Sequence, residues 1–219
     1  MAPLTLEQSL EAIDAMIAEG EPRLVITANL NYAMLTAQND RLRQANAAAA
    51  LILADGMPLV WASRRAATPE QPKLPERVAG SDLVPALCAR AAERGHRIFL
   101  LGAALGVAAA AADKLRAQCP QIQIVGIEAP PFRALTVEEH EALVARIREA
   151  KPDLLFVAFG QPRGELWIHE NLQRLGVPVQ IQVGATIDFL AGRVRRAPRW
   201  IQAIGLEWAF RLALEPRRL

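Results

Sequence analysis

The sequence lacks the features that mark a membrane-spanning or secreted protein. Its 219 residues contain no run of about 18 apolar residues, so no transmembrane helix is expected. The first turns carry Glu7, Glu11, Asp14 and Glu19 in a helical pattern, where a signal peptide would have a basic start and an apolar stretch. We therefore expect a cytoplasmic protein, unless the chain is recruited to a membrane surface.

Residues that bind metals are scarce and poorly spaced. Cys88 and Cys119 stand far apart, which favours free buried thiols over a disulfide or a metal site. The three histidines show no HxxxH spacing, and the chain has no DxD pair of aspartates. We predict no metal ion and no cofactor.

The two familiar glycine-rich nucleotide loops are also missing. The segment 101–106 leads from a predicted strand into a helix, but it matches neither GxGxxG nor a Walker sequence. N–H groups at that helix start could still bind a phosphate. The missing GxGxxG argues against an oxidoreductase with a Rossmann-like sheet, which stays only a weak hypothesis for the function.

Charge is distributed unevenly along the chain. Residues 193–219 carry seven arginines and two acids, a local charge of +5, while the whole chain has +2 and the first 192 residues therefore −3. This concentration indicates a specific anionic partner for the segment, and we expect no nucleic acid partner.

The same C-terminal segment has apolar residues at helical spacing. These are Trp200, Ile201, Ile204, Trp208 and Leu212. Together with the arginines they resemble an amphipathic helix that lies in a membrane interface, where each basic residue contributes on the order of 1 kcal/mol. A helix that packs on its own domain with the arginines in solvent is the alternative.

Apolar segments of strand length alternate with helical segments over the rest of the chain. Strands are expected at 24–27, 51–54, 97–101, 122–125, 154–159 and 177–183. Helices are expected from the capping boxes at Thr5 and Thr136, from a Ser81 cap, and over 40–50, 105–118 and 164–175. The pattern predicts an α/β, Rossmann-like parallel sheet with helices on both faces over 1–192, followed by a helical appendage over 193–219.

Several predicted strands end at residues suited to a ligand site. Gly102, Gly126, Gly160 and Gly184 are expected at strand ends, where ligands of open α/β sheets bind and where glycine lets backbone approach a ligand. Tight turns are the alternative reason for each glycine. Thr27 and Asn29 follow another strand.

Two charged residues are candidates for chemistry at the same strand ends. Asp55 follows the second strand, where a carboxylate can act as a general base or bond its own turn. Without a metal ion, arginines or helix ends must neutralise a leaving diphosphate, and Arg77 is a candidate.

These residues occur in an ordered series of motifs. The series runs Thr27-x-Asn29, Ala54-Asp55-Gly56, Glu76-Arg77-Val78-x-Gly80-Ser81-Asp82-Leu83, Phe99-Leu100-Leu101-Gly102, Gly160-x-Pro162-x-x-Glu165-x-Trp167-Ile168, Val183-Gly184-x-x-x-Asp188-Phe189-x-Ala191-Gly192, Arg196-Ala197-Pro198-x-Trp200, Gly205-Leu206-Glu207-Trp208 and Arg211-Leu212-x-x-Glu215-Pro216-x-Arg218. In this order and over nearly the whole chain, the sequence resembles the WecG/TagA/CpsF family, glycosyltransferase family 26.

The resemblance implies an inverting, metal-independent glycosyltransferase of bacterial cell-surface polysaccharide synthesis. The donor would be UDP-N-acetylmannosamine, its uronic acid or UDP-glucose, and the acceptor a polyprenyl-diphosphate-linked sugar at the cytoplasmic face of the inner membrane. Asp55 would be the base. The substrate-binding residues would be Thr27, Asn29, Arg77, Gly102, Gly160, Pro162, Glu165, Gly184 and Asp188. The lipid diphosphate and membrane would contact Arg196, Arg199, Trp200, Arg211 and Arg218.

One position departs from the family pattern Gly-x-Pro-Lys-Gln-Glu. This chain has Gly164 in place of the glutamine and Arg163 in place of the lysine. The loss of an amide leaves open a nucleotide-sugar-binding assembly subunit that does not transfer. Whether the chain forms a homo-oligomer is also open.

Overall fold

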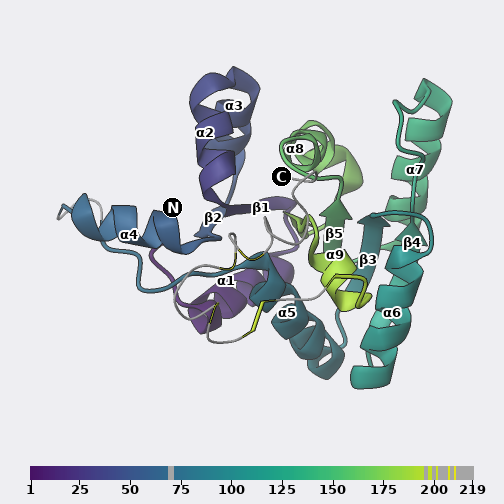
Figure 1. The fold of residues 1–219 in the computed structure, drawn as a ribbon. Coiled ribbons are helices and arrows are strands. Elements are labelled where there is room, and N and C mark those ends of the chain that lie inside the picture. Colours follow the sequence, from purple (N-terminus) through teal and green to yellow (C-terminus); the bar gives the residue numbers. More distant parts are fainter. Residues whose placement is uncertain (69–71, 195–196, 199–200, 202–206, 208–209, 211–219) are drawn as a thin grey trace.

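The fold is a parallel sheet between two layers of helices. The computed structural model describes residues 1–68, 72–194, 197–198, 201, 207 and 210. In this part of the chain six parallel strands form one sheet in the order β2-β1-β6-β5-β3-β4 (Figure 1). The strands are β1 (Arg23–Ala28), β2 (Leu51–Ala54), β3 (Arg97–Gly102), β4 (Gln123–Glu128), β5 (Leu154–Ala158) and β6 (Val179–Gln182). The predicted α/β fold is confirmed.

Helices cover both faces of the sheet. One face carries α2 (Leu30–Gln38), α3 (Asp40–Ala48), α7 (Val137–Ala150) and α8 (Arg163–Leu175). The other carries α1 (Leu6–Glu19), α5 (Gly80–Arg94), α6 (Val107–Gln118) and α9 (Thr186–Leu190). Figure 1 shows α2, α3 and α8 above the sheet and α1 and α5 below it. Helix α4 (Met57–Arg65) lies at the β2 edge.

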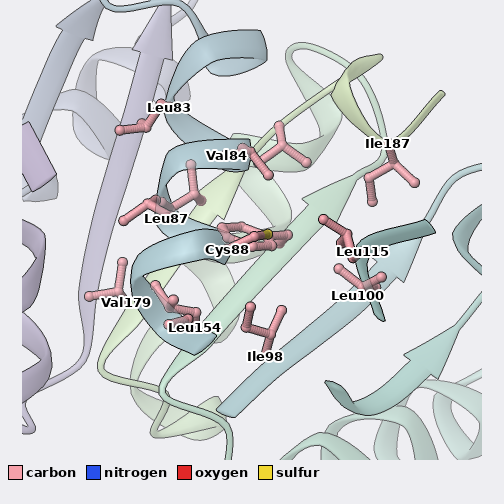
Figure 2. Packing of buried hydrophobic residues seen from close by; sticks show 14 of the residues in the cluster. Leu83, Val84, Leu87, Cys88, Ile98, Leu100, Leu115, Leu154, Val179 and Ile187 are labelled. Carbon is pink, nitrogen blue, oxygen red and sulfur yellow. The ribbon is translucent and has the colours of Figure 1, made fainter. Parts of the chain in front are cut away.

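The alternation of strand side chains produces two cores. In β5, Leu154 and Phe156 face the α1–α5–α6 layer, while Leu155 and Val157 face the α7–α8 layer. Figure 2 shows α5 packed on the first of these cores, with Cys88 among leucines and valines. The strands β1, β2, β3, β5 and β6 are buried on both faces, as expected for the continuously apolar strands of a parallel sheet, whereas the edge strand β4 is only half-buried.

The helix starts test the capping predictions. Thr5 and Thr136 form the predicted capping boxes with Gln8 and Glu139. The prediction of a Ser81 cap is wrong, because α5 begins at Gly80 after Ala79, without a side-chain cap. A Cβ at Gly80 would lie 3.3 Å from Thr186 Oγ1, so glycine lets the first turn of α5 pack closely.

Three helices were not predicted from the sequence: α2, α4 and α9. Helix α2 has nine residues and buries only Tyr32 of them, so it carries no clear apolar periodicity. Its start is nevertheless readable, because Asn29 is its N-cap.

The glycine predictions need one correction. Gly126 lies inside β4, not at its end, and a Cβ there would overlap the Phe99 ring. Its role is therefore to make room for an aromatic ring in the neighbouring strand β3. Gly102 is the last residue of β3, and Gly160 and Gly184 follow the ends of β5 and β6.

Candidate functional site

The carboxyl ends of the strands gather the predicted site residues at one edge of the sheet. After β1 and β5 the chain passes to α2 and α8 on one face, and after β6 it passes to α9 on the other. Strand β6 lies between β1 and β5. Neighbouring connections that leave to opposite faces make this a topological switch point, the place where open α/β sheets bind ligands.

Thr27 ties three segments together at this edge. Its hydroxyl donates to the Gln182 carbonyl of β6 at 3.4 Å, and its own carbonyl accepts from Gln161 Nε2 at 3.2 Å. A Cβ at Gly80 would lie 3.7 Å from the same hydroxyl. Thr27 is buried, so it fixes the positions of β6, the β5–α8 connection and the start of α5.

Asn29 caps the helix that follows Thr27. Its Oδ1 accepts from the Tyr32 backbone N–H at 2.8 Å. The side chain is half-buried at the strand end. The cap therefore fixes the orientation of the Asn29 side chain at the same edge of the sheet as Thr27.

Asp55 and Arg77 meet at the end of β2. The Asp55 N–H donates to the Ala28 carbonyl at 2.7 Å, and the Val78 N–H donates to the Ala54 carbonyl at 2.9 Å. These two bonds hold three segments together: the one that follows β1, the one that follows β2 and the one that precedes α5. Asp55 is half-buried, and its charge acts on Arg77.

Arg77 is held by acidic side chains. Its Nη2 lies 2.9 Å from Asp82 Oδ2, and its Nη1 lies 2.7 Å from Glu207 Oε2 in the C-terminal segment. Burial lowers the pKa of the guanidinium, but Glu207, Asp82 and Asp55 together raise it above its ordinary value. Arg77 therefore stays charged beside the predicted base.

The three site glycines differ in what surrounds them. Gly160 and Gly184 have φ angles of 77° and 53°, and a Cβ at either would meet nothing within 4 Å. The space above both leaves room for a ligand. At Gly102 a Cβ would lie 2.8 Å from the Ala158 carbonyl, so packing against β5 explains that glycine without a ligand.

The start of α8 has no side chain at Gly164, and Gln182 fills the space. A Cβ at Gly164 would overlap the end of the Gln182 side chain. In the orientation that satisfies both groups, the Gln182 amide donates to the Val157 carbonyl and accepts from the Gly160 N–H at 3.0 Å. An amide from β6 thus lies where a longer side chain on α8 would have to go. Pro162, the N-cap residue of α8, precedes this turn.

Glu165 lies below the surface of the site. Its side chain is 0% exposed, and neither carboxylate oxygen has a hydrogen-bond partner among the described residues. Burial raises its pKa to about 7, and the dipoles of its own backbone N–H and of the Gln161 amide, which do not reach hydrogen-bond geometry, offset only part of this rise. Burial raises the pKa of Tyr32 on α2, and the charge of Glu165 raises it further. Glu165, which was predicted to bind substrate, is thus a fully buried residue of α8 whose charge acts on Tyr32 of α2.

The remaining predicted residues lie at the C-terminal end. Asp188 is on α9, and its carbonyl accepts from the Arg193 N–H at 3.0 Å. The predicted membrane residues Arg196, Arg199, Trp200, Arg211 and Arg218 lie outside the described residues. Their roles, and the division of the chain at residue 193, stay predictions.

An aromatic cavity at the same edge was not predicted. A cavity of about 410 Å³ lies between the starts of α7 and α8, and Phe159, Arg163, Trp167 and His140 line it. The Arg163 guanidinium lies 5.3 Å from the Phe159 ring centroid and 5.6 Å from that of Phe132. Phe132 is 95% exposed. The sequence signal was Phe159, an aromatic residue directly after the strand that ends at Ala158.

The described part of the chain holds neither a metal-binding cluster nor a membrane-spanning helix. No group of three or more His, Cys, Asp and Glu side chains comes together there to hold a metal ion. None of the described helices is both long and apolar enough to cross a bilayer.

Comparison with known families matches the chain over residues 1–219 to the model described as glycosyl transferase WecG/TagA/CpsF family. The match covers every motif from which the resemblance was drawn. Proteins of this family are glycosyltransferases of cell-surface polysaccharide synthesis. This chain therefore belongs to the WecG/TagA/CpsF family of glycosyltransferases.

Proposed function

We propose that this glycosyltransferase moves a sugar from a UDP-sugar to a polyprenyl-diphosphate-linked sugar, with inversion and without a metal ion. The sugar would be N-acetylmannosamine, its uronic acid or glucose. The observation that carries the proposal is the half-buried Asp55 beside the charged Arg77 at the carboxyl edge of the sheet, in a chain that belongs to this family.

Asp55 supplies the base in this proposal. Its carboxylate takes the proton of the acceptor hydroxyl as that oxygen attacks the anomeric carbon of the donor. The bond from the anomeric carbon to the diphosphate oxygen breaks, and UDP leaves with the electron pair. Attack from the face opposite the leaving group inverts the configuration, so the base and the diphosphate lie on opposite sides of the sugar.

The aromatic cavity supports a position for the donor nucleotide. It borders α8, which follows β5, whereas Asp55 follows β2. Three strand spacings separate β2 from β5, which is roughly 14 Å. This span is comparable with the extended length of a nucleoside diphosphate sugar. The open backbone at Gly184 follows β6, which lies between these ends, while Gly160 and Arg163 lie at the cavity end, and all three would face the diphosphate.

The packing at Gly164 gives the glycine a structural reason that is compatible with transfer. Gly164 removes an amide from α8, and the buried Gln182 amide fills the space and bonds Gly160 and Val157. The amide from β6 therefore supports the turn beside the proposed diphosphate position.

Recruitment to the cytoplasmic membrane face is part of the proposal. Beyond the arginines of 193–219, helix α4 presents an exposed Trp61 together with exposed Arg64 and Arg65. Tryptophan and arginine are suited to an anionic membrane interface. Anionic liposomes should retain the protein in a salt-sensitive manner, and deletion of 193–219 should weaken retention. Equal pelleting of the truncated protein would contradict the role given to this segment.

The test of the transferase is a donor screen. The full-length protein is incubated with each UDP-sugar and a polyprenyl-diphosphate-linked acceptor, and released UDP is measured. Release with one donor, dependent on the acceptor, is the expected result. Donor binding by calorimetry without UDP release from any donor would instead favour the binding subunit.

A further inference from the structure

The contact between Arg77 and Glu207 joins segments that are 130 residues apart in the sequence. Arg77 immediately precedes the α5 region at the site edge, and Glu207 belongs to the C-terminal segment. Their atoms Nη1 and Oε2 are 2.7 Å apart, and the two side chains are only 15% and 12% exposed. Most other ion pairs of the described chain are more exposed, for example Arg174 with Glu141 at 47% and 55%.

Burial gives this ion pair energetic weight. An exposed ion pair contributes little because water screens both charges, whereas removing one partner of a buried pair leaves a charge without compensation. Asp82 occupies the second edge of the same guanidinium at 2.9 Å. Glu207 therefore completes a two-sided clamp that fixes the orientation of Arg77.

The clamp also changes what Arg77 can do for a substrate. With Asp82 and Glu207 on its two terminal nitrogens and the charge of Asp55 close by, its positive charge is already balanced by acidic groups. A guanidinium in this position is better suited to holding carboxylates in place than to receiving a diphosphate. After Glu207 and Asp82, Asp55 is the third carboxylate whose charge acts on this guanidinium, so the orientation of Arg77 affects the charge around the proposed base.

We propose that Glu207 is a positioning residue that anchors the C-terminal segment on Arg77 and thereby orients Arg77 beside Asp55. The positioning part rests on the proposed function, since it assumes that Asp55 is the base. Loss of the Glu207 carboxylate would have two effects. It would free the C-terminal segment from Arg77, and it would let the Arg77 guanidinium move relative to Asp55. Donor binding would be retained, because the aromatic cavity is built from other segments.

The experiment compares Glu207→Gln, Glu207→Asp and the control Glu19→Gln in the full-length protein. Glu19→Gln removes a carboxylate from an exposed ion pair with Arg23, in which the Arg23 and Glu19 side chains are 43% and 57% exposed. The first readout needs no activity: trypsin cleavage after the arginines of 193–211, followed by intact mass. Glu207→Gln should be cleaved roughly tenfold faster than the unmodified protein, as expected when one charged hydrogen bond is lost. Circular dichroism checks that the variants are folded.

Coupling to Arg77 is measured with Arg77→Gln and the double variant. If the two residues act through one contact, the double variant should be cleaved no faster than the faster single variant. The second readout is turnover against donor affinity. Glu207→Gln should lower kcat by at least about tenfold with an unchanged donor dissociation constant, and Glu207→Asp should recover part of kcat.

The outcomes separate this proposal from the transferase proposal. Unchanged cleavage in Glu207→Gln, or additive effects in the double variant, would overturn the anchor. Faster cleavage with wild-type kcat would overturn the positioning role. If the unmodified protein releases no UDP with any donor, the transferase proposal fails, and the cleavage comparison still decides the anchor.

Discussion

Glu165 gives the protein a specific pH dependence of stability. Its pKa rises from an ordinary value of 4.5 to about 7 on folding because the carboxylate is buried. The folded state therefore holds a proton that the unfolded state loses between those two values, so stability falls as pH rises from 4.5 to 7 and is then constant. A shift of this size corresponds to about 3 kcal/mol.

Glu165→Gln isolates this contribution, since glutamine has the shape of the protonated acid and does not ionise. The free energy of unfolding is measured by urea denaturation at about pH 4 and about pH 8 for both proteins. At the lower pH, the free energy of unfolding of the variant should match that of the unmodified protein. At the higher pH, it should exceed that of the unmodified protein by up to about 3 kcal/mol.

The control for this experiment is Glu149→Gln, which changes an exposed glutamate on α7 and should leave the pH dependence unaltered. A constant difference between Glu165→Gln and the unmodified protein across the pH range would refute the reasoning. So would a variant that is less stable at the higher pH, because that result would mean that the ionised carboxylate is stabilised in the folded protein.

Other predictions follow from single contacts. Gly164→Ala should displace the Gln182 amide and cost about 1–3 kcal/mol in chemical denaturation, and an unchanged midpoint would contradict the packing. Asn29→Ala should cost about 1 kcal/mol by removing the cap of α2, measured the same way. Iodoacetamide should label the half-buried Cys119 in the native protein but reach Cys88 only after denaturation, because burial raises the Cys88 pKa to about 12; labelling at equal rates would argue against this burial.

Much of the fold could be predicted from the sequence, for physical reasons that apply residue by residue. Strands such as Leu51–Ala54 are buried on both faces, so their apolar runs identify them directly. The capping boxes at Thr5 and Thr136 are local, so their spacing was sufficient. Helix α4 was not found, because Gly56 and Pro58 at its start are also typical of turns.

The site was less predictable, because its properties depend on contacts between distant segments. The sequence indicated that Asp55 and Arg77 follow and precede regular elements, but only the fold shows Arg77 between Asp82 and Glu207. Glu165 was recognised as part of a motif, and its burial beside Tyr32 could not be inferred from spacing. Similarly, no local signal connects Gly164 with Gln182.

The central claim is that Asp55 is the base of a sugar transfer at the carboxyl edge of the sheet. The measurement that tests it most directly is turnover by Asp55→Asn with the donor and lipid-linked acceptor identified in the screen, together with donor affinity by calorimetry. The account predicts that turnover falls by roughly two to four decades while donor binding is preserved. Turnover by Asp55→Asn at the rate of the unmodified protein would contradict it.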